Sequence, residues 1–138
     1  MDYVTGVTTN PNLMAKVGGE PLKILQDLLA VRDWPVFYQP GAVGEGALSE
    51  ARAAWQLDTE QVVAKLPASP WAFPLAGELR RTGCRVSITA VYTVAQAVLA
   101  AAVGTVSVII CVDRARRLMA EGGQELTRAI ARTVRGDK

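Results

Sequence analysis

Short runs rich in β-branched residues alternate five times with longer helix-forming segments along this chain. The runs occupy residues 3–9, 36–39, 61–67, 85–91 and 105–112, and their composition predicts β-strands. The connections are long enough for crossovers between parallel strands, so the strands are expected to pair in parallel under a cover of helices. The sequence therefore predicts an α/β fold made of successive strand–helix units.

The connecting segments carry helix formers and apolar residues at helical spacing. They predict helices over about residues 13–16, 20–31, 45–55, 69–82, 93–103 and 113–135. Ser69 and Pro70 are expected to start the fourth helix as its cap and first residue, and Pro74 to distort its first turns. The last helix has a Gly122–Gly123 break before its apolar stripe, which consists of Leu126, Ile130 and Val134.

Composition narrows the possible classes of protein. A chain of 138 residues, half of them hydrophobic, predicts one domain over residues 1–138. A net charge of +2 gives no basic field, so nucleic acid is not an expected partner. The absence of histidine excludes histidine triads and histidine metal sites, and Cys84 and Cys111 make neither a disulfide framework nor a metal-ligand spacing. We expect no metal, no cofactor and a cytoplasmic protein without a leader segment.

The segment from Val86 to Val112 contains no charged residue and is long enough to span a bilayer. Its β-branched residues gather at both ends, around an alanine-rich centre with interspersed Ser, Thr and Gln. This distribution favours strand, helix and strand in a buried α/β core over one membrane span. No membrane is expected as a partner.

Lys65 closes the apolar run Gln61–Leu66, and Pro67 stops it. A lysine kept from water loses the hydration that favours its charged form, so its pKa falls from about 10.4 and the amine becomes nucleophilic. Schiff-base chemistry with a carbonyl compound is the obvious use. The alternative is a strand-end lysine whose stem covers the core while its amine stays in solvent.

Ligands of parallel α/β folds bind at the carboxyl ends of the strands. The polar residues at the predicted ends are Asn10, Gln39, Lys65, Thr89 and the corner Cys111-Val112-Asp113-Arg114. Alternation along a strand puts Val63 and Lys65 on one face of the third strand, and Ser87, Thr89 and Val91 on one face of the fourth. We therefore expect a polar cluster around one amine.

Four segments carry a resemblance to a known family. They are Gly6-Val7-Thr8-Thr9-Asn10-Pro11, Val62-Val63-Ala64-Lys65-Leu66-Pro67, Thr89-Ala90-Val91-Tyr92 with Ala95-Gln96-Ala97, and Val112-Asp113-Arg114. In order and spacing the chain resembles the transaldolase and fructose-6-phosphate aldolase family, which are class I aldolases on a (β/α)8 barrel. The resemblance runs from about Gly6 to the final helix. It implies an incomplete TIM barrel of about five strands, without the family's first and last two strands.

The resemblance also implies roles for individual residues. Lys65 matches the lysine that forms the Schiff base, and Gln39 and Thr89 match the residues that hold the catalytic water. Asn10 matches an asparagine that binds substrate hydroxyls, and Arg114 an arginine that meets the substrate phosphate. Ordinary structural roles remain open for three of them: a helix cap for Asn10, a strand position for Thr89 and a solvated charge for Arg114.

Three further residues complete the comparison with the family. Ser87, on the face of Thr89, is a candidate substrate-binding residue. Cys111, also assigned to substrate binding, stands where the aldolase branch has a tyrosine. Asp2 precedes the first motif directly and does not replace the aspartate of the family's first strand.

The expected function is a transaldolase-like transfer or release of a dihydroxyacetone unit from a ketose phosphate through a lysine Schiff base. One alternative is a catalytically impaired relative that only binds sugar phosphate or a partner chain. Another is an open doubly wound sheet that binds a nucleotide, although no Gly-rich phosphate loop follows any predicted strand. Five strands do not close a barrel, so we expect a homo-oligomer, with the stripe of the final helix as a candidate contact.

Overall fold

The computed structural model describes residues 3–118 and 122–135. Asp2 and residues 119–121, next to the predicted Gly122–Gly123 break, lie outside the described residues. The strands are β1 (Val7–Thr8), β2 (Val36–Tyr38), β3 (Val62–Pro67), β4 (Arg85–Val91) and β5 (Ser107–Ile110). The helices are α1 (Pro11–Val17), α2 (Pro21–Leu29), α3 (Glu45–Leu57), α4 (Ala72–Arg81), α5 (Val94–Val103), α6 (Val112–Leu118) and α7 (Gly122–Arg135).

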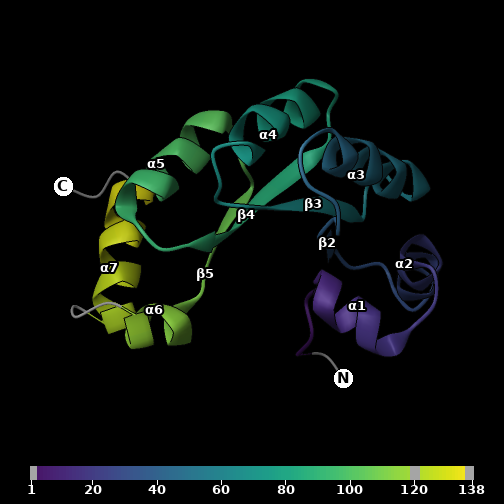
Figure 1. Cartoon of the computed structure of the whole chain (residues 1–138), viewed down its shortest axis with the longest axis horizontal. Helices are drawn as coiled ribbons and strands as arrows, with labels where there is room; N and C mark the ends of the chain where they lie inside the picture. Colours follow the sequence, from purple (N-terminus) through teal and green to yellow (C-terminus); the bar gives the residue numbers. More distant parts are fainter. Residues whose placement is uncertain (1–2, 119–121, 136–138) are drawn as a thin grey trace.

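The five strands form one parallel sheet in the sequential order β1-β2-β3-β4-β5. Parallel strands twist in one direction, so the sheet curls, and the helices follow its convex side in an arc (Figure 1). The result is a half-barrel of (β/α) units, which confirms the predicted fold class. A doubly wound sheet reverses its strand order and carries helices on both faces, so the nucleotide-binding alternative is wrong about the architecture.

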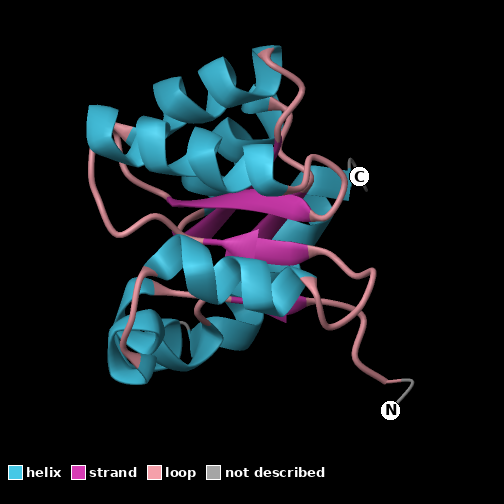
Figure 2. Cartoon of the chain, turned by 90° about the vertical axis from the view of Figure 1, so that its right-hand side faces the viewer, coloured by secondary structure: helices cyan, strands magenta, loops and turns pink. Residues whose placement is uncertain are grey.

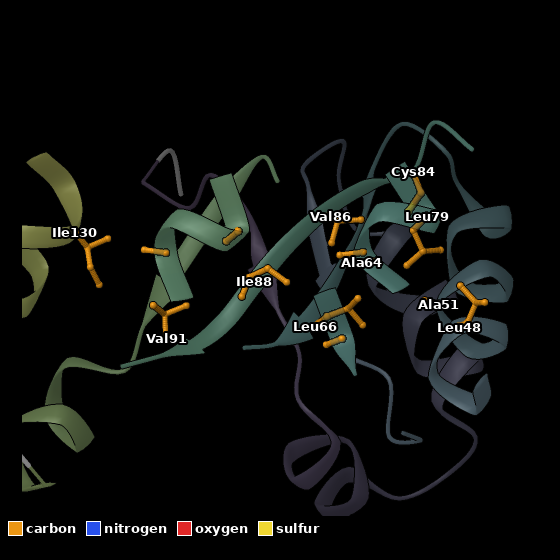
Figure 3. Packing of buried hydrophobic residues seen from close by; sticks show 14 residues of the cluster. Leu48, Ala51, Ala64, Leu66, Leu79, Cys84, Val86, Ile88, Val91 and Ile130 are labelled. Carbon is orange, nitrogen blue, oxygen red and sulfur yellow. The ribbon is translucent and has the colours of Figure 1, made fainter. Parts of the chain in front are cut away.

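The larger hydrophobic core fills the space between the convex face of β3 and β4 and the helices above it (Figure 3). Ala64, Leu66, Val86 and Ile88 alternate along the two strands, and each is at most 1% exposed. α4 contributes Leu79, which is fully buried. Full burial of one such aliphatic side chain contributes about 1.5–3 kcal/mol, so this layer fixes which face of β3 is left for polar residues.

A second core lies beneath α1, α2 and α3. Its strand residues are Val36 and Tyr38 of β2 and Val62 of β3, and the helices contribute Leu25 and Met14. In the side view the strands run across the middle of the molecule, with helices above and below them (Figure 2). The convex face of the sheet is thus covered from β2 to β4, and the concave face remains for the site.

The uncharged segment Val86–Val112 forms most of β4, then α5, then β5, as predicted. Thr93 caps α5: its hydroxyl accepts from the Gln96 N–H at 3.1 Å, and the Gln96 side chain bonds back to the cap. Among the described helices, none is long and apolar enough to cross a bilayer.

The structure corrects the predicted start of the fourth helix. α4 begins at Ala72, with Trp71 as a cap that makes no side-chain hydrogen bond. Ser69 does not cap it, and the Ser69 hydroxyl oxygen is buried without a hydrogen-bond partner in the described chain. Because of the later start, Pro74 falls in the first turn, where a helix needs no N–H donor, and it is accommodated there.

Two strands are shorter than predicted. β1 contains only Val7–Thr8, although the β-branched run is longer, and β5 contains only Ser107–Ile110. Both are edge strands with a single neighbour, so fewer backbone hydrogen bonds hold their ends.

The stripe on the final helix is divided between the core and the surface. Ile130 is 3% exposed and belongs to the larger core, and Leu126 packs against it. Val134 is 44% exposed. Ile130 is therefore already used within the chain, and of the stripe Val134 is the residue most open to a partner.

Candidate active site

Lys65 lies on the concave side of the sheet, near the carboxyl end of β3. Its neighbours Ala64 and Leu66 point into the core under the helices, so alternation directs Lys65 the other way. The residue is 6% exposed. The amine is therefore buried inside the curl of the sheet and does not extend into bulk solvent.

The Lys65 amine reaches β1 across the intervening strand. Nζ donates to Thr8 Oγ1 at 2.7 Å and to the backbone carbonyl oxygen of Thr9. Thr8 is 57 positions away in sequence, and it is the curl of the sheet that brings the two residues together. Thr8 and Thr9 are the contacts that sequence reasoning missed, although both belong to the Gly6–Pro11 segment that it singled out.

Burial lowers the pKa of the Lys65 amine, because the ammonium form loses hydration. Cys111 opposes the shift through its charge interaction with the amine. The net effect is a lowered pKa, so a larger fraction of the Lys65 amine is neutral and nucleophilic than in a solvated lysine at the same pH.

The hydrogen bonds of Lys65 also suit a neutral amine. An ammonium group has three N–H donors, whereas a neutral amine has two and a lone pair. Thr8 and Thr9 accept two bonds, and within residues 3–118 and 122–135 no carboxylate forms an ion pair with Nζ. In the neutral form the lone pair is then free of protein hydrogen bonds.

Thr89 lies at the carboxyl end of β4, opposite Pro67 in the sheet register. The residue is 8% exposed, and its carbonyl oxygen accepts from the Ala68 N–H at 2.7 Å. This bond ties the end of β4 to the segment that follows β3. Thr89 is thus held at the strand end where the sequence placed it.

A β-bulge follows Thr89. Ala90 has a positive φ of 56°, and the register between β4 and β5 shifts between Ile88 and Val91. The extra residue turns Val91 into the larger core together with Ile88. The predicted common face of Ser87, Thr89 and Val91 is therefore wrong for Val91.

Ser87 is adjacent to Lys65 in the sheet but is fully buried. Its hydroxyl lies 2.8 Å from the Ser107 hydroxyl and 3.2 Å from the Ser107 carbonyl oxygen. The Ser87 hydroxyl is thus engaged with β5, and this geometry favours a strand-to-strand role over the predicted substrate contact.

Gln39 follows β2 and is partly exposed. Its backbone N–H donates to Thr9 Oγ1 at 3.2 Å, and the Thr9 hydroxyl in turn donates to the Phe37 carbonyl oxygen at 3.2 Å. The residue lines a cavity of about 280 Å³ beside α1 that also contains Tyr38 and Glu50. The hydrogen bonds of the Lys65 amine in the described chain go to Thr8 and Thr9, and not to Gln39.

Asn10 caps α1, because its side-chain oxygen accepts from the Leu13 N–H at 2.9 Å. This is the structural role that the sequence left open. The side-chain nitrogen is a separate donor, so the cap orients the amide without using all of it.

The corner after β5 holds the remaining predicted residues. Cys111 is a partly exposed free thiol close enough to Lys65 to influence its pKa. Arg114 is exposed in α6, and its guanidinium donates to the Tyr92 hydroxyl at 3.3 Å. The described residues contain no group of three His, Cys, Asp or Glu side chains that could hold a metal ion.

The sequence comparisons with known proteins agree on one family. Residues 43–135 match the family described as transaldolase/fructose-6-phosphate aldolase. A probable transaldolase of Methanococcus maripaludis (strain C7) is 34% identical over 105 residues, which are 75% of this chain and 48% of that protein. A probable transaldolase of Roseiflexus sp. (strain RS-1) is 32% identical over 136 residues, 96% of this chain and 61% of the relative.

The match to Caldicellulosiruptor saccharolyticus, also a probable transaldolase, is 29% identical and covers 96% of this chain and 60% of the relative. The chain thus spans about half to three fifths of the length of the curated relatives it matches. Among solved structures, a mandelate oxidase variant with (S)-mandelic acid aligns with a TM-score of 0.53 at 16% identity, over 86% of this chain and 37% of the oxidase. That likeness concerns the fold alone.

Proposed function

This chain belongs to the transaldolase/fructose-6-phosphate aldolase family, and from that membership we propose that Lys65 forms a Schiff base with a ketose phosphate and transfers or releases a dihydroxyacetone unit. The observation that carries the proposal is the buried Lys65 amine, whose pKa is lowered and whose two hydrogen-bond acceptors leave a lone pair free. An exposed lysine has neither a pKa lowered by burial nor an amine held by fixed hydrogen bonds.

The proposed reaction begins when the neutral amine adds to the ketose carbonyl carbon. Loss of water from this adduct gives an iminium ion between Lys65 and the substrate. The iminium then accepts the electron pair of the neighbouring carbon–carbon bond as that bond breaks, and an enamine of the dihydroxyacetone unit stays on the lysine. The departing fragment becomes an aldehyde when its hydroxyl loses a proton.

That proton goes to a water molecule, and Thr89 and Gln39 are the proposed residues that hold it. Thr89 supports this role through its buried position at the strand end. Gln39 supports it through its place directly after β2, where its backbone N–H is bonded to the Thr9 hydroxyl oxygen. The enamine finally takes up a proton, or adds to an acceptor aldehyde, and either step restores an iminium on Lys65. Water then adds to this iminium, and expulsion of the Lys65 amine releases dihydroxyacetone or the transfer product.

Thr8 and Thr9 hold the amine before substrate arrives. Their oxygens fix two N–H directions, so the lone pair keeps one orientation and less freedom is lost in the attack. Asn10 is proposed to donate from its side-chain nitrogen to a substrate hydroxyl while its oxygen caps α1.

The test is reductive trapping. Wild-type protein incubated with dihydroxyacetone or fructose 6-phosphate and borohydride should gain the mass of one reduced adduct, and peptide mapping should place it on Lys65. Lys16 and Lys23 are exposed, and they serve as internal controls for non-specific reductive amination.

Lys65→Met should abolish the adduct while the exposed lysines react as before. An adduct spread evenly over all lysines, or none on Lys65 while a full-length relative is trapped in parallel, would overturn the Schiff-base proposal.

The second candidate is binding without turnover. It is favoured by the five-stranded sheet, which curls without closing into a barrel (Figure 1). Protection against heat by fructose 6-phosphate, without any adduct on Lys65, would select this alternative. A Lys65 adduct with measurable release of glyceraldehyde 3-phosphate would exclude it.

A further inference from the structure

Tyr92 and Arg114 are in contact near the carboxyl ends of the strands. Tyr92 directly follows β4, and Arg114 lies in α6, just after β5. The Arg114 guanidinium donates to the Tyr92 hydroxyl oxygen at 3.3 Å. Two neighbouring strands thus each supply one member of the pair.

Arg114 has unused hydrogen-bonding capacity. A guanidinium has five N–H donors, and one of them is directed to Tyr92. The adjacent carboxylate, Asp113, forms its ion pair with Arg117, one helical turn further on. In the part of the chain that the structure describes, Arg114 has no carboxylate partner, so its charge is available to an anion.

Tyr92 is held from its backbone. The Gln96 side-chain oxygen accepts from the Tyr92 N–H at 2.8 Å and from the Thr93 N–H at 3.1 Å. The Gln96 side-chain nitrogen donates to the Ala68 carbonyl oxygen at 3.0 Å, in the segment after β3. Tyr92 is therefore anchored at the ends of two strands, whereas Arg114 is an exposed, long side chain.

We propose that Tyr92 positions Arg114, and that the two side chains act as one anion-binding unit for the phosphate of the substrate. This inference rests on the proposed function for the nature of the ligand. The Tyr92 oxygen accepts from Arg114, which leaves the phenolic hydrogen as a second donor. An anion at the open side of the guanidinium then receives charge-assisted bonds from both residues.

The positioning has a physical reason. A free arginine side chain loses considerable rotamer freedom when it binds a ligand, and a partner that holds it beforehand reduces that loss. Tyr92 can do this because its own backbone is fixed by Gln96.

The experiment compares Tyr92→Phe with wild type, Arg114→Ala and Arg116→Ala, using calorimetric titration with fructose 6-phosphate and with inorganic phosphate. Removal of the hydroxyl should weaken binding of both ligands about ten- to hundredfold, the range expected for one hydrogen bond to an ionic group. Arg114→Ala should weaken it at least as much. Arg116→Ala removes an exposed charge two positions away and should leave binding unchanged.

Thr93→Ala is the structural control, because it loosens the start of α5 but keeps the Tyr92 hydroxyl. It should lower stability without changing the preference for fructose 6-phosphate over fructose. Equal binding by Tyr92→Phe and wild type, while Arg114→Ala binds weakly, would overturn the proposal. Loss of the preference for fructose 6-phosphate in Thr93→Ala would also overturn the proposal. Destabilisation of the start of α5 would then be enough to explain weaker phosphate binding.

Trapping of dihydroxyacetone on Lys65 separates this inference from the proposed function, since dihydroxyacetone carries no phosphate. Normal trapping in Tyr92→Phe together with weaker phosphate binding supports both. Trapping with phosphate binding that does not depend on Tyr92 leaves the Schiff base standing and overturns the inference. Phosphate binding that depends on Tyr92 without any trapping supports the inference and removes the catalytic function.

Discussion

Lys65 combines burial with two neutral hydrogen-bond acceptors and lacks a carboxylate partner among the described residues. A buried ammonium is costly unless it is paired, so this environment opposes protonation. The same environment that prepares the amine for attack on a carbonyl therefore reduces the stability of the fold at pH values where lysine is charged.

We predict a pH-dependent effect of Lys65→Met on the free energy of unfolding. Because the folded-state pKa of Lys65 is lowered, the unfolded chain binds more protons, and wild-type stability rises with pH from the folded pKa to about 10.4. Lys65→Met lacks the titrating amine. Its free energy of unfolding should therefore fall relative to that of wild type as the pH rises across this window. Urea unfolding of both proteins at several pH values measures the difference.

Lys16→Met is the matched control, since Lys16 is exposed on α1. Its stability difference from wild type should be small and should not vary with pH in the same way. A Lys65→Met difference that stays constant from neutral pH to about 10.4 would contradict a lowered pKa.

At the scale of single residues, the sequence indicated Lys65 because a single lysine ended an apolar run before a proline. It did not indicate Thr8 and Thr9 as the partners of the amine, since that contact joins residues 57 and 56 positions apart and depends on the curl of the sheet. Nor did it indicate that Ser87 is engaged with Ser107, which requires the register between β4 and β5.

At the scale of elements, α5 shows a helix start that the sequence located well. Thr93 was predicted as its first residue, and it is the cap, in a reciprocal arrangement with Gln96. Sequence spacing is informative here because both partners are local. The predicted start of α4 failed for the opposite reason: Ser69 and Pro70 form a local cap pattern, but the connection from β3 continues to Trp71 before the helix begins.

The Thr93 cap yields a prediction of its own. Thr93→Ala removes the acceptor of the Gln96 N–H and should destabilise the protein by about 0.5–2 kcal/mol. Thr93→Ser keeps an acceptor oxygen and should remain close to wild type. Denaturant unfolding of the two variants measures the comparison, and equal losses would mean that the hydroxyl contributes nothing as a cap.

The bulge in β4 could not be predicted from sequence. Positive φ angles are usually occupied by glycine or asparagine, and Ala90 gives no such signal. The bulge at this position changes the face of Val91, the last residue of β4. Alternation therefore predicted Ser87 and Thr89 together but failed at Val91.

For the whole molecule, the sequence predicted the class of fold, the order of the elements and the parallel pairing, because the alternation of strands and helices is strong and local. The half-barrel leaves β1 and β5 as open edges. We continue to expect association between copies, with Val134 on α7 as an exposed apolar candidate at the contact.

Val134→Glu tests this expectation. Val134 lines a cavity of about 540 Å³ between β5 and α7, and a carboxylate there should disfavour burial against a second chain. Light scattering after size-exclusion chromatography should show an oligomer for wild type and a smaller species for the variant. Val17→Glu, on α1 and 74% exposed, is the control and should behave as wild type. A folded wild-type monomer at low concentration would refute the expectation.

The sequential order of the sheet has a consequence for how the chain is made. Each strand pairs with the one synthesised just before it, so no unit waits for a distant partner while the ribosome completes the chain. Folding can then proceed from the first unit to the last, and the three strands that bring the Lys65 amine to its β1 acceptors all lie in the first half of the chain.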